Sequence, residues 1–169
     1  ASIVSWQERL VLRTAHLPQG SPCSPALANL CAYRLDKRLE ALAVSCNARY
    51  SRYADDLIFS GGKELEKMMN SFHVHVAMIA LDEGFSVNTR KTRMMRRGVR
   101  QQVTGIVVND HPNIRRDDFD NLKATLTNCI RHGPTSQNRE GRDQYQQFLA
   151  GKIAYVEMIH AQRGKRLRE

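Results

Sequence analysis

The stretch Arg52-Tyr53-Ala54-Asp55-Asp56-Leu57-Ile58-Phe59-Ser60 places two adjacent carboxylates between two short apolar runs. Residues 48–53 and 57–60 are rich in aromatic, β-branched and aliphatic side chains, and Gly61-Gly62 closes the second run. This pattern predicts a tight β-hairpin with both carboxylates at its tip. We expect the rest of the chain to be organised around that hairpin.

Asp55 and Asp56 would repel each other at such a tip unless a cation or water separates their charges. Mg²⁺ prefers hard oxygen ligands and is usually held by one or two carboxylates together with substrate phosphates. The pair therefore indicates a site for catalytic Mg²⁺ or Mn²⁺. The alternative is that Asp is simply a favourable turn residue, and a second motif is needed to decide.

The length of 169 residues and the hydrophobic fraction of 41% suit one globular domain, or one domain with a small appendage. The sequence holds no apolar run of about 18 residues, so we expect no membrane span and no membrane partner. It begins without Met inside an expected helix, which indicates a piece of a longer protein. We interpret its cysteines as reduced, mostly buried thiols of a cytoplasmic protein; they are Cys23, Cys31, Cys46 and Cys129.

Positive charge is abundant and clustered. The chain has 26 Lys and Arg against 17 Asp and Glu, for a formal net charge of +9. Residues 90–116 contain eight basic residues and one acid, Asp110, and the tail repeats the bias with Arg163, Lys165, Arg166 and Arg168. Such clusters favour a polyanionic partner, nucleic acid above all, because neutralised phosphates release their counterions. The alternative is a solvated basic face that maintains solubility.

The first part of the chain predicts two helices joined by a stiff loop. Residues 3–13 have the spacing of a short amphipathic helix. The loop Leu17 to Pro25 contains three prolines and Gly20, and Ser24 and Pro25 suit the start of the next helix. That helix would have one apolar face of Leu27, Leu30, Cys31, Leu35, Leu39 and Leu42. Gln19 and Gly20 can approach a ligand closely, although such loops are also ordinary helix entries.

Beyond the hairpin, residues 64–83 predict a helix that ends at Gly84. Its expected inward residues are Leu65, Met68, Met69, Phe72, Val76, Ile79 and Leu81. Residues 85–88 are interpreted as a strand, and a second strand pair as 92–95 with 102–108, joined across 96–100. Lys91 is a candidate proton donor or phosphate contact, with a purely electrostatic role as the alternative.

The last third predicts helices after a Pro-containing linker over residues 111–114. A helix should begin at Arg116 and end at Gly133-Pro134, with Phe119, Leu122, Leu126 and Cys129 or Ile130 on its apolar face. Residues 142–161 should form one or two helices, interrupted near Gly151. Their inward residues would be Tyr145, Phe148, Leu149, Ile153 and Val156.

Three segments resemble consecutive motifs of reverse transcriptases in order and spacing. They are Leu17-Pro18-Gln19-Gly20-Ser21-Pro22, then Tyr53-Ala54-Asp55-Asp56, then Gly84-Phe85 with Asn88 and Lys91-Thr92. Within that family the chain resembles the bacterial group that includes retron enzymes and group II intron proteins. Arg100-Gln101-Gln102-Val103-Thr104-Gly105 is similar to the matching retron segment. The resemblance covers nearly the whole chain and is weaker after Arg116.

The resemblance implies an α+β fold: a right-hand polymerase palm, with an antiparallel sheet packed on helices, over residues 1–110, and an all-helical thumb over residues 111–169. It implies an RNA-directed DNA polymerase that adds dNTPs to a primer by a two-metal mechanism, with a role in antiphage defence if it is retron-type. The family also needs a third aspartate from an upstream strand, and residues 1–16 contain no Asp. We therefore expect the palm and thumb of a longer polymerase, without its fingers, that is inactive alone.

The same resemblance assigns roles to single residues. Asp55 and Asp56 would be the catalytic metal ligands, Asp55 the firmer of the two, and Lys91 would assist the departure of pyrophosphate. The residues matching the nucleotide and template contacts are Gln19, Gly20, Ser21 and Tyr53. The strand from Val103 to Val108 would lie near the primer grip. Candidate nucleic-acid contacts are Arg90, Arg93, Arg100, Val103, Thr104, Gly105, Arg115, Arg116 and Lys123.

The expected partners are an RNA template, an RNA/DNA duplex, dNTPs and, in a retron-like enzyme, a cognate structured RNA. Two other functions remain open. The chain could be a binding module for structured RNA without catalysis, or part of another right-hand-palm polymerase that copies RNA. Binding through phosphate contacts should survive Asp55→Asn, whereas catalysis should not.

Overall fold

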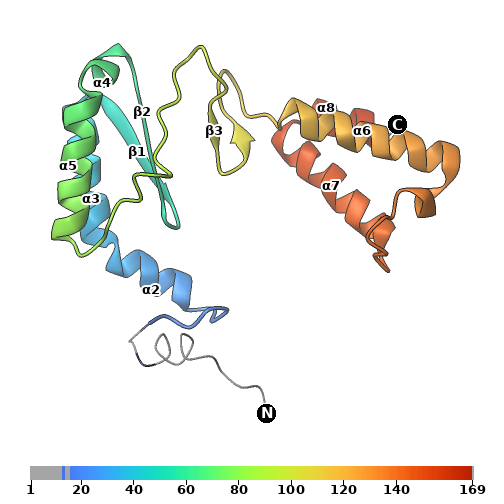
Figure 1. Cartoon of the computed structure of the whole chain (residues 1–169), viewed down its shortest axis with the longest axis horizontal. Coiled ribbons are helices and arrows are strands. Elements are labelled where there is room, and N and C mark those ends of the chain that lie inside the picture. Colours follow the sequence, from blue (N-terminus) through green and yellow to red (C-terminus); the bar gives the residue numbers. More distant parts are fainter. Residues whose placement is uncertain (1–12, 14–15, 169) are drawn as a thin grey trace. The chain divides into compact units, whose positions relative to one another are not determined.

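The computed structural model describes residues 13 and 16–168, and the chain divides into two compact units at Thr92 and Arg93 (Figure 1). Each unit has its own cluster of buried apolar side chains. The helix expected over residues 3–13 lies outside the described residues, apart from Arg13. Mixed helices and small antiparallel sheets make the fold α+β, as the sequence predicts. Across the described residues, no helix combines the length and the apolar content that crossing a membrane requires.

The first unit consists of one β-hairpin that is preceded and followed along the chain by helices. Its elements are α2 (Ser24–Cys31), α3 (Tyr33–Ser45), β1 (Ala48–Tyr53), β2 (Asp56–Gly61), α4 (Lys63–Lys67) and α5 (Met69–Asp82). The single helix expected after Pro25 is broken at Ala32, and the one expected over residues 64–83 is broken at Met68. Each break changes the direction of the apolar face, so the inward residues differ from those expected.

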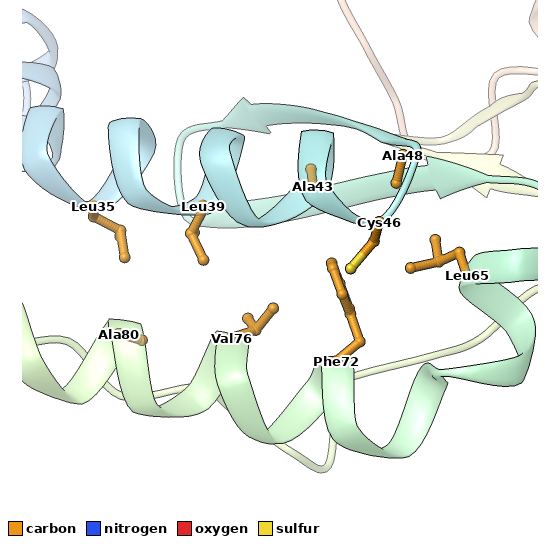
Figure 2. Close-up of a cluster of buried hydrophobic side chains, with 9 residues drawn as sticks. All are labelled: Leu35, Leu39, Ala43, Cys46, Ala48, Leu65, Phe72, Val76 and Ala80. Carbon is orange, nitrogen blue, oxygen red and sulfur yellow. The ribbon is translucent and has the colours of Figure 1, made fainter.

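The core of this unit lies where α3 faces α5, as Figure 2 shows. Its buried residues are Leu35, Leu39, Ala43, Cys46, Ala48, Leu65, Phe72, Val76 and Ala80. Leu39 is completely buried, and Arg38 ties the two helices together through Asp82 at 2.8 Å and Glu83 at 2.9 Å.

Several expected core residues of this unit are exposed instead. Among the described residues of α2 none is buried, and Leu27, Leu30 and Cys31 are exposed, because the break at Ala32 separates α2 from the face of α3. Met68 lies in the break between α4 and α5. Ala80 takes the inward position four residues after Val76, which leaves Leu81 on the solvent side. Cys23 is also exposed, so two of the four cysteines are not buried as expected.

The hairpin is as predicted. β1 and β2 are antiparallel, with Ala48 opposite Gly61 and Tyr53 opposite Asp56. Side chains alternate between faces along each strand, and the face of Ala48, Tyr50, Leu57 and Phe59 packs on the α3–α5 core. The opposite face, which carries Tyr53 and Asp56, is not covered by that core.

Residues 85–95 do not form the expected strands. Gly84, at φ +83°, ends α5: its amide bonds Leu81 O and the Phe85 amide bonds Ala80 O at 2.8 Å, which is the Schellman arrangement. Residues 85–88 then run on without a strand partner, and Val87 packs against the first core. Residues 92–95 are also not a strand, because residues 102–103 pair with a nearer segment.

The second unit begins with a short hairpin and continues as helices. Its elements are β3 (Gln102–Val103), β4 (Ile106–Val107), α6 (Arg116–His132), a 3-10 turn (Pro134–Ser136), α7 (Tyr145–Ile159) and α8 (Ala161–Arg168). Thr104 and Gly105, with φ of +48° and +88°, form the turn between β3 and β4, so the single strand expected over residues 102–108 is wrong. The expected linker is also tied down, because Asn113 exchanges two backbone hydrogen bonds with Val107.

The helices of this unit enclose a second core of Ile114, Leu122, Leu149 and Val156. Cys129, not the exposed Ile130, completes the apolar face of α6. α7 runs through Gly151 without interruption, and the chain turns instead at His160. α8 then packs closely on α7, since a Cβ on Gly164 would collide with the Glu157 backbone. Arg168 fixes the end of α8 through Glu157 at 2.9 Å.

We predict that Gly164→Ala lowers the free energy of unfolding by about 1–3 kcal/mol, because the added methyl group forces α8 away from α7. Gly151→Ala is the matched control: Gly151 lies inside α7, and its Cβ would meet no atom within 4 Å. That substitution should raise stability by roughly 0.5–1 kcal/mol. Urea denaturation of both variants tests the difference, and equal effects would contradict close packing at Gly164.

Candidate active site

The hairpin tip exposes both carboxylates. Ala54 and Asp55 form the turn, and Asp56 is the first residue of β2, directly opposite Tyr53. All four residues from Tyr53 to Asp56 are exposed, and Tyr53 keeps 67% of its surface. Ala54 has φ +51°, in the left-handed region, which costs a residue with a Cβ roughly 1–2 kcal/mol. The tip is therefore a strained and accessible turn.

The donor chemistry of this tip suits Mg²⁺ or Mn²⁺. Asp55 and Asp56 offer only hard carboxylate oxygens, the ligands that these ions prefer. Within the described residues, no group of three or more His, Cys, Asp and Glu side chains lies close enough together to hold a metal. The described part of the chain thus offers two adjacent carboxylates of the kind that bind these ions.

Arg52 supports the tip from the other face of the hairpin. Its Nε and Nη2 donate to the two oxygens of Asp36 in α3, both at 2.8 Å. Its Nη1 donates to the carbonyl oxygen of Ala54 at 2.8 Å, and Nη2 also reaches Asn29 Oδ1 in α2 at 3.1 Å. The Tyr50 hydroxyl donates to Asp36 Oδ1 at 2.7 Å. The turn is therefore bonded through Arg52 to both helices.

The hydrogen bonds of this network favour the charged forms of Asp36 and Arg52. The hydrogen bond from Arg52 lowers the pKa of Asp36, and that from Tyr50 adds to the effect against the opposing influence of burial. The hydrogen bond to Asp36 likewise raises the pKa of Arg52. Burial, followed by the bond to Asp36, raises the pKa of Tyr50. Asp36 and Arg52 therefore form a charge-assisted, two-bond pair, which is stronger than a neutral hydrogen bond.

Sequence reasoning missed this network, although a signal for it exists. Arg52 shares the core-facing side of β1 with Ala48 and Tyr50, as strand alternation alone indicates. A charged side chain on a core-facing side needs a partner. What alternation could not supply is the identity of that partner, Asp36, which is sixteen residues away in α3.

The loop before α2 forms a defined turn. The Ser21 amide approaches the Pro18 carbonyl at 3.5 Å, with Gly20 at φ +86° in the third position, which matches a type II turn. Ser24 is not the cap of α2, since Cys23 holds that position; its hydroxyl donates to the Pro18 carbonyl at 2.6 Å instead. Gln19 and Gly20 are exposed, and Ser21 is half-buried.

Lys91 also lies in a turn. The Asn88 carbonyl accepts hydrogen bonds from the Lys91 amide at 3.1 Å and from both the amide and the hydroxyl of Thr92. The Lys91 side chain is exposed. In the part of the chain that the structure describes, no hydrogen bond or ion pair joins it to Asp55 or Asp56.

The candidate nucleic-acid contacts fall mostly in the second unit; Arg90 belongs to the first. Arg93, Arg100 and Lys123 are exposed. Arg115 lies 3.5 Å from Asp117 and Arg116 lies 3.5 Å from Asp120, so both are partly neutralised at the N-terminus of α6. Thr104 and Gly105 are exposed at the β3–β4 turn, and Val103 is half-buried.

Comparison with known proteins adds the family. The family model described as reverse transcriptase (RNA-dependent DNA polymerase) matches residues 2–137. The chain is 39% identical over 151 residues to the retron Mx65 reverse transcriptase of Myxococcus xanthus. The aligned region covers 88% of this chain and 33% of that protein. It is 39% identical over 163 residues to the retron Mx162 reverse transcriptase of the same organism, with the same coverage.

A third relative is more distant. The chain is 34% identical over 111 residues to the retron Ec86 reverse transcriptase of Escherichia coli, covering 65% of this chain and 34% of that protein. The chain thus spans about a third of the length of the curated relatives that it matches.

The Asp36 network predicts a specific acid sensitivity. Because the folded pKa of Asp36 is lowered, its ionised form stabilises the fold above about pH 4, and this contribution is lost as the pH falls through the lowered value. The melting temperature of the wild type should therefore exceed that of Asp36→Asn at pH 6, with a gap that closes toward pH 3. Asp110→Asn controls for the loss of one carboxylate. A gap that stays constant or widens on acidification would contradict the assignment.

Proposed function

The chain belongs to the reverse transcriptase family, and we propose that it forms part of an RNA-directed DNA polymerase, contributing two of its catalytic carboxylates. One observation carries this proposal: the family match over residues 2–137 includes a hairpin whose tip exposes Asp55 and Asp56 side by side. Their oxygen donors suit the divalent ions that phosphoryl transfer requires.

The residues take the following roles. Asp55 and Asp56 would hold Mg²⁺ or Mn²⁺, and the bound ions would supply positive charge to the oxygens that attack and leave in phosphoryl transfer. The turn of Gln19, Gly20 and Ser21, with the Tyr53 ring, contacts the incoming dNTP and the template. Lys91 donates a proton or a positive charge to the departing pyrophosphate. Its exposed side chain is compatible with this role.

We assign residues 1–110 to the palm and residues 111–169 to the thumb. The second compact unit, residues 93–169, holds fifteen of the 26 Lys and Arg but only eight of the 17 Asp and Glu, which supports contact with phosphates there. The template is RNA and the product an RNA/DNA duplex. The relatives named as retron reverse transcriptases support a retron-type enzyme. We further propose that it has a structured RNA partner and acts in the cytoplasm in antiphage defence.

Polymerisation needs more than the described residues bring together. Two carboxylates meet at the hairpin tip, and the described residues contain no cluster of three metal-binding side chains. We propose that a third acid comes from a longer polypeptide, and that the 169 residues alone do not extend a primer.

A second function is favoured by the charge of the second unit. Residues 93–169 could grip structured RNA without chemistry, because phosphate binding needs clustered positive charge and not the hairpin acids. Polymerisation requires the Asp55 carboxylate, whereas RNA binding through phosphate contacts does not.

Primer extension on an RNA template with Mg²⁺ or Mn²⁺ tests the proposal, using the native polypeptide that contains these residues. We expect Asp55→Asn to lower extension at least about a hundredfold, since even groups that merely support metal ligands cost 10–100-fold. RNA binding should be unchanged. Asp110→Asn, which neutralises another exposed carboxylate, should retain activity.

Extension by the native polypeptide and by the Asp110 variant, but not by the Asp55 variant or the 169 residues alone, supports the polymerase. No extension on any primed template, together with an RNA affinity that Asp55→Asn does not change, would favour the binding module. Extension by the 169 residues alone would refute the need for a third acid from elsewhere.

A further inference from the structure

We propose that Arg52 is a positioning residue for the two catalytic carboxylates, a role that rests on the proposed function. Arg52 touches neither Asp55 nor Asp56 among the described contacts; it acts through the carbonyl oxygen of Ala54.

The guanidinium group is enclosed and fully engaged. The Arg52 side chain keeps only 12% of its surface, and each of its three nitrogens donates a hydrogen bond of 2.8 Å. Two of these go to Asp36, which Tyr50 holds in place at 2.7 Å, and the third goes to Ala54 O. Asn29 provides a further acceptor from α2. This environment fixes the guanidinium before any substrate binds.

A held Ala54 carbonyl constrains Asp55 directly. The carbonyl of Ala54 and the nitrogen and Cα of Asp55 lie in one planar peptide group. Fixing the oxygen against Arg52 therefore fixes the plane from which the Asp55 side chain and the start of β2 project. The constraint matters at this residue, because the left-handed conformation of Ala54 (φ +51°) is one that an unsupported alanine rarely adopts.

Arg52 also leaves the reacting face open. Arg52 and Leu57 lie on the side of the hairpin that faces α3 and α5, whereas Tyr53 and Asp56 lie on the opposite side. Arg52 and Asp56 therefore do not compete for space.

Arginine suits this role better than lysine. Its planar fork can bond both oxygens of Asp36 and still direct a nitrogen at Ala54, whereas the single nitrogen of lysine cannot reproduce this divergent geometry. Arg52→Lys keeps the positive charge and the partial burial, so it separates geometry from charge.

The test compares Arg52→Gln and Arg52→Lys with Lys67→Gln in the native polypeptide. Lys67 is the control for the loss of one positive charge: it is exposed on α4, which follows the end of β2 away from the tip, and no described ion pair involves it. Two readouts are used, namely primer extension as a function of Mg²⁺ concentration, and a Mn²⁺ titration followed by electron paramagnetic resonance without substrate. RNA binding and thermal melting are recorded beside them.

We expect Arg52→Gln to lower kcat about 10–100-fold and to raise the half-saturating Mg²⁺ and Mn²⁺ concentrations, with RNA binding unchanged. Arg52→Lys should show the same shifts to a smaller degree in a folded protein, and it decides the question if Arg52→Gln does not fold. Lys67→Gln should match the wild type.

If the metal dependence and kcat of both Arg52 variants equal those of Lys67→Gln, the inference is overturned, whereas the proposed polymerase activity is not affected. A wild type that extends no primer would overturn the polymerase instead. The Mn²⁺ titration then decides on Arg52 alone: weaker Mn²⁺ binding than in Lys67→Gln supports positioning, and equal binding refutes it.

Discussion

The first unit depends on one constraint: a two-stranded hairpin is not stable in water unless one of its faces is buried. β1 and β2 meet it by packing Ala48, Tyr50, Leu57 and Phe59 against α3 and α5. Because side chains alternate strictly along a strand, this burial assigns every residue of the hairpin to a side. Tyr53 and Asp56 are thereby exposed, and Arg52 is directed inward. The geometry of the tip follows from how the core is packed.

The inward side chain of Arg52 needs hydrogen-bond partners, and α2 and α3 provide them. A guanidinium removed from water is costly unless it is paired, and pairing is favourable only when the hydrogen bonds are well formed. Asp36 lies on α3, and its two carboxylate oxygens accept hydrogen bonds from Nε and Nη2 of Arg52. The alternation of side chains along β1 thus builds the core and also directs Arg52 toward α3, where it links the turn to that helix. The stability of the unit and the placement of Asp55 and Asp56 are therefore coupled.

The hairpin and most helices could be predicted from sequence because their signals are local. Gly84 and Gly133 end helices where expected, both with positive φ. The predictions that failed concern features that depend on contacts between different segments of the chain. Residues 85–88 and 92–95 have strand-like composition but no partner, and residues 102–103 pair with a segment only a turn away. A strand is defined by what it pairs with, which composition does not reveal. The breaks at Ala32 and Met68, and the Asp36–Arg52 pair, likewise depend on packing between elements.

The hairpin tip breaks several local rules at once, and this argues for a role beyond connecting two strands. A turn with no other task would place Gly or Asn where the backbone is left-handed, yet Ala54 occupies that position. Two like charges sit side by side, and a large aromatic ring, Tyr53, is left mostly in water. Each choice costs stability, and Arg52 offsets part of the cost by bonding the strained turn. Such local conflicts, held in place by their surroundings, are expected at functional sites, because selection for chemistry is what retains them.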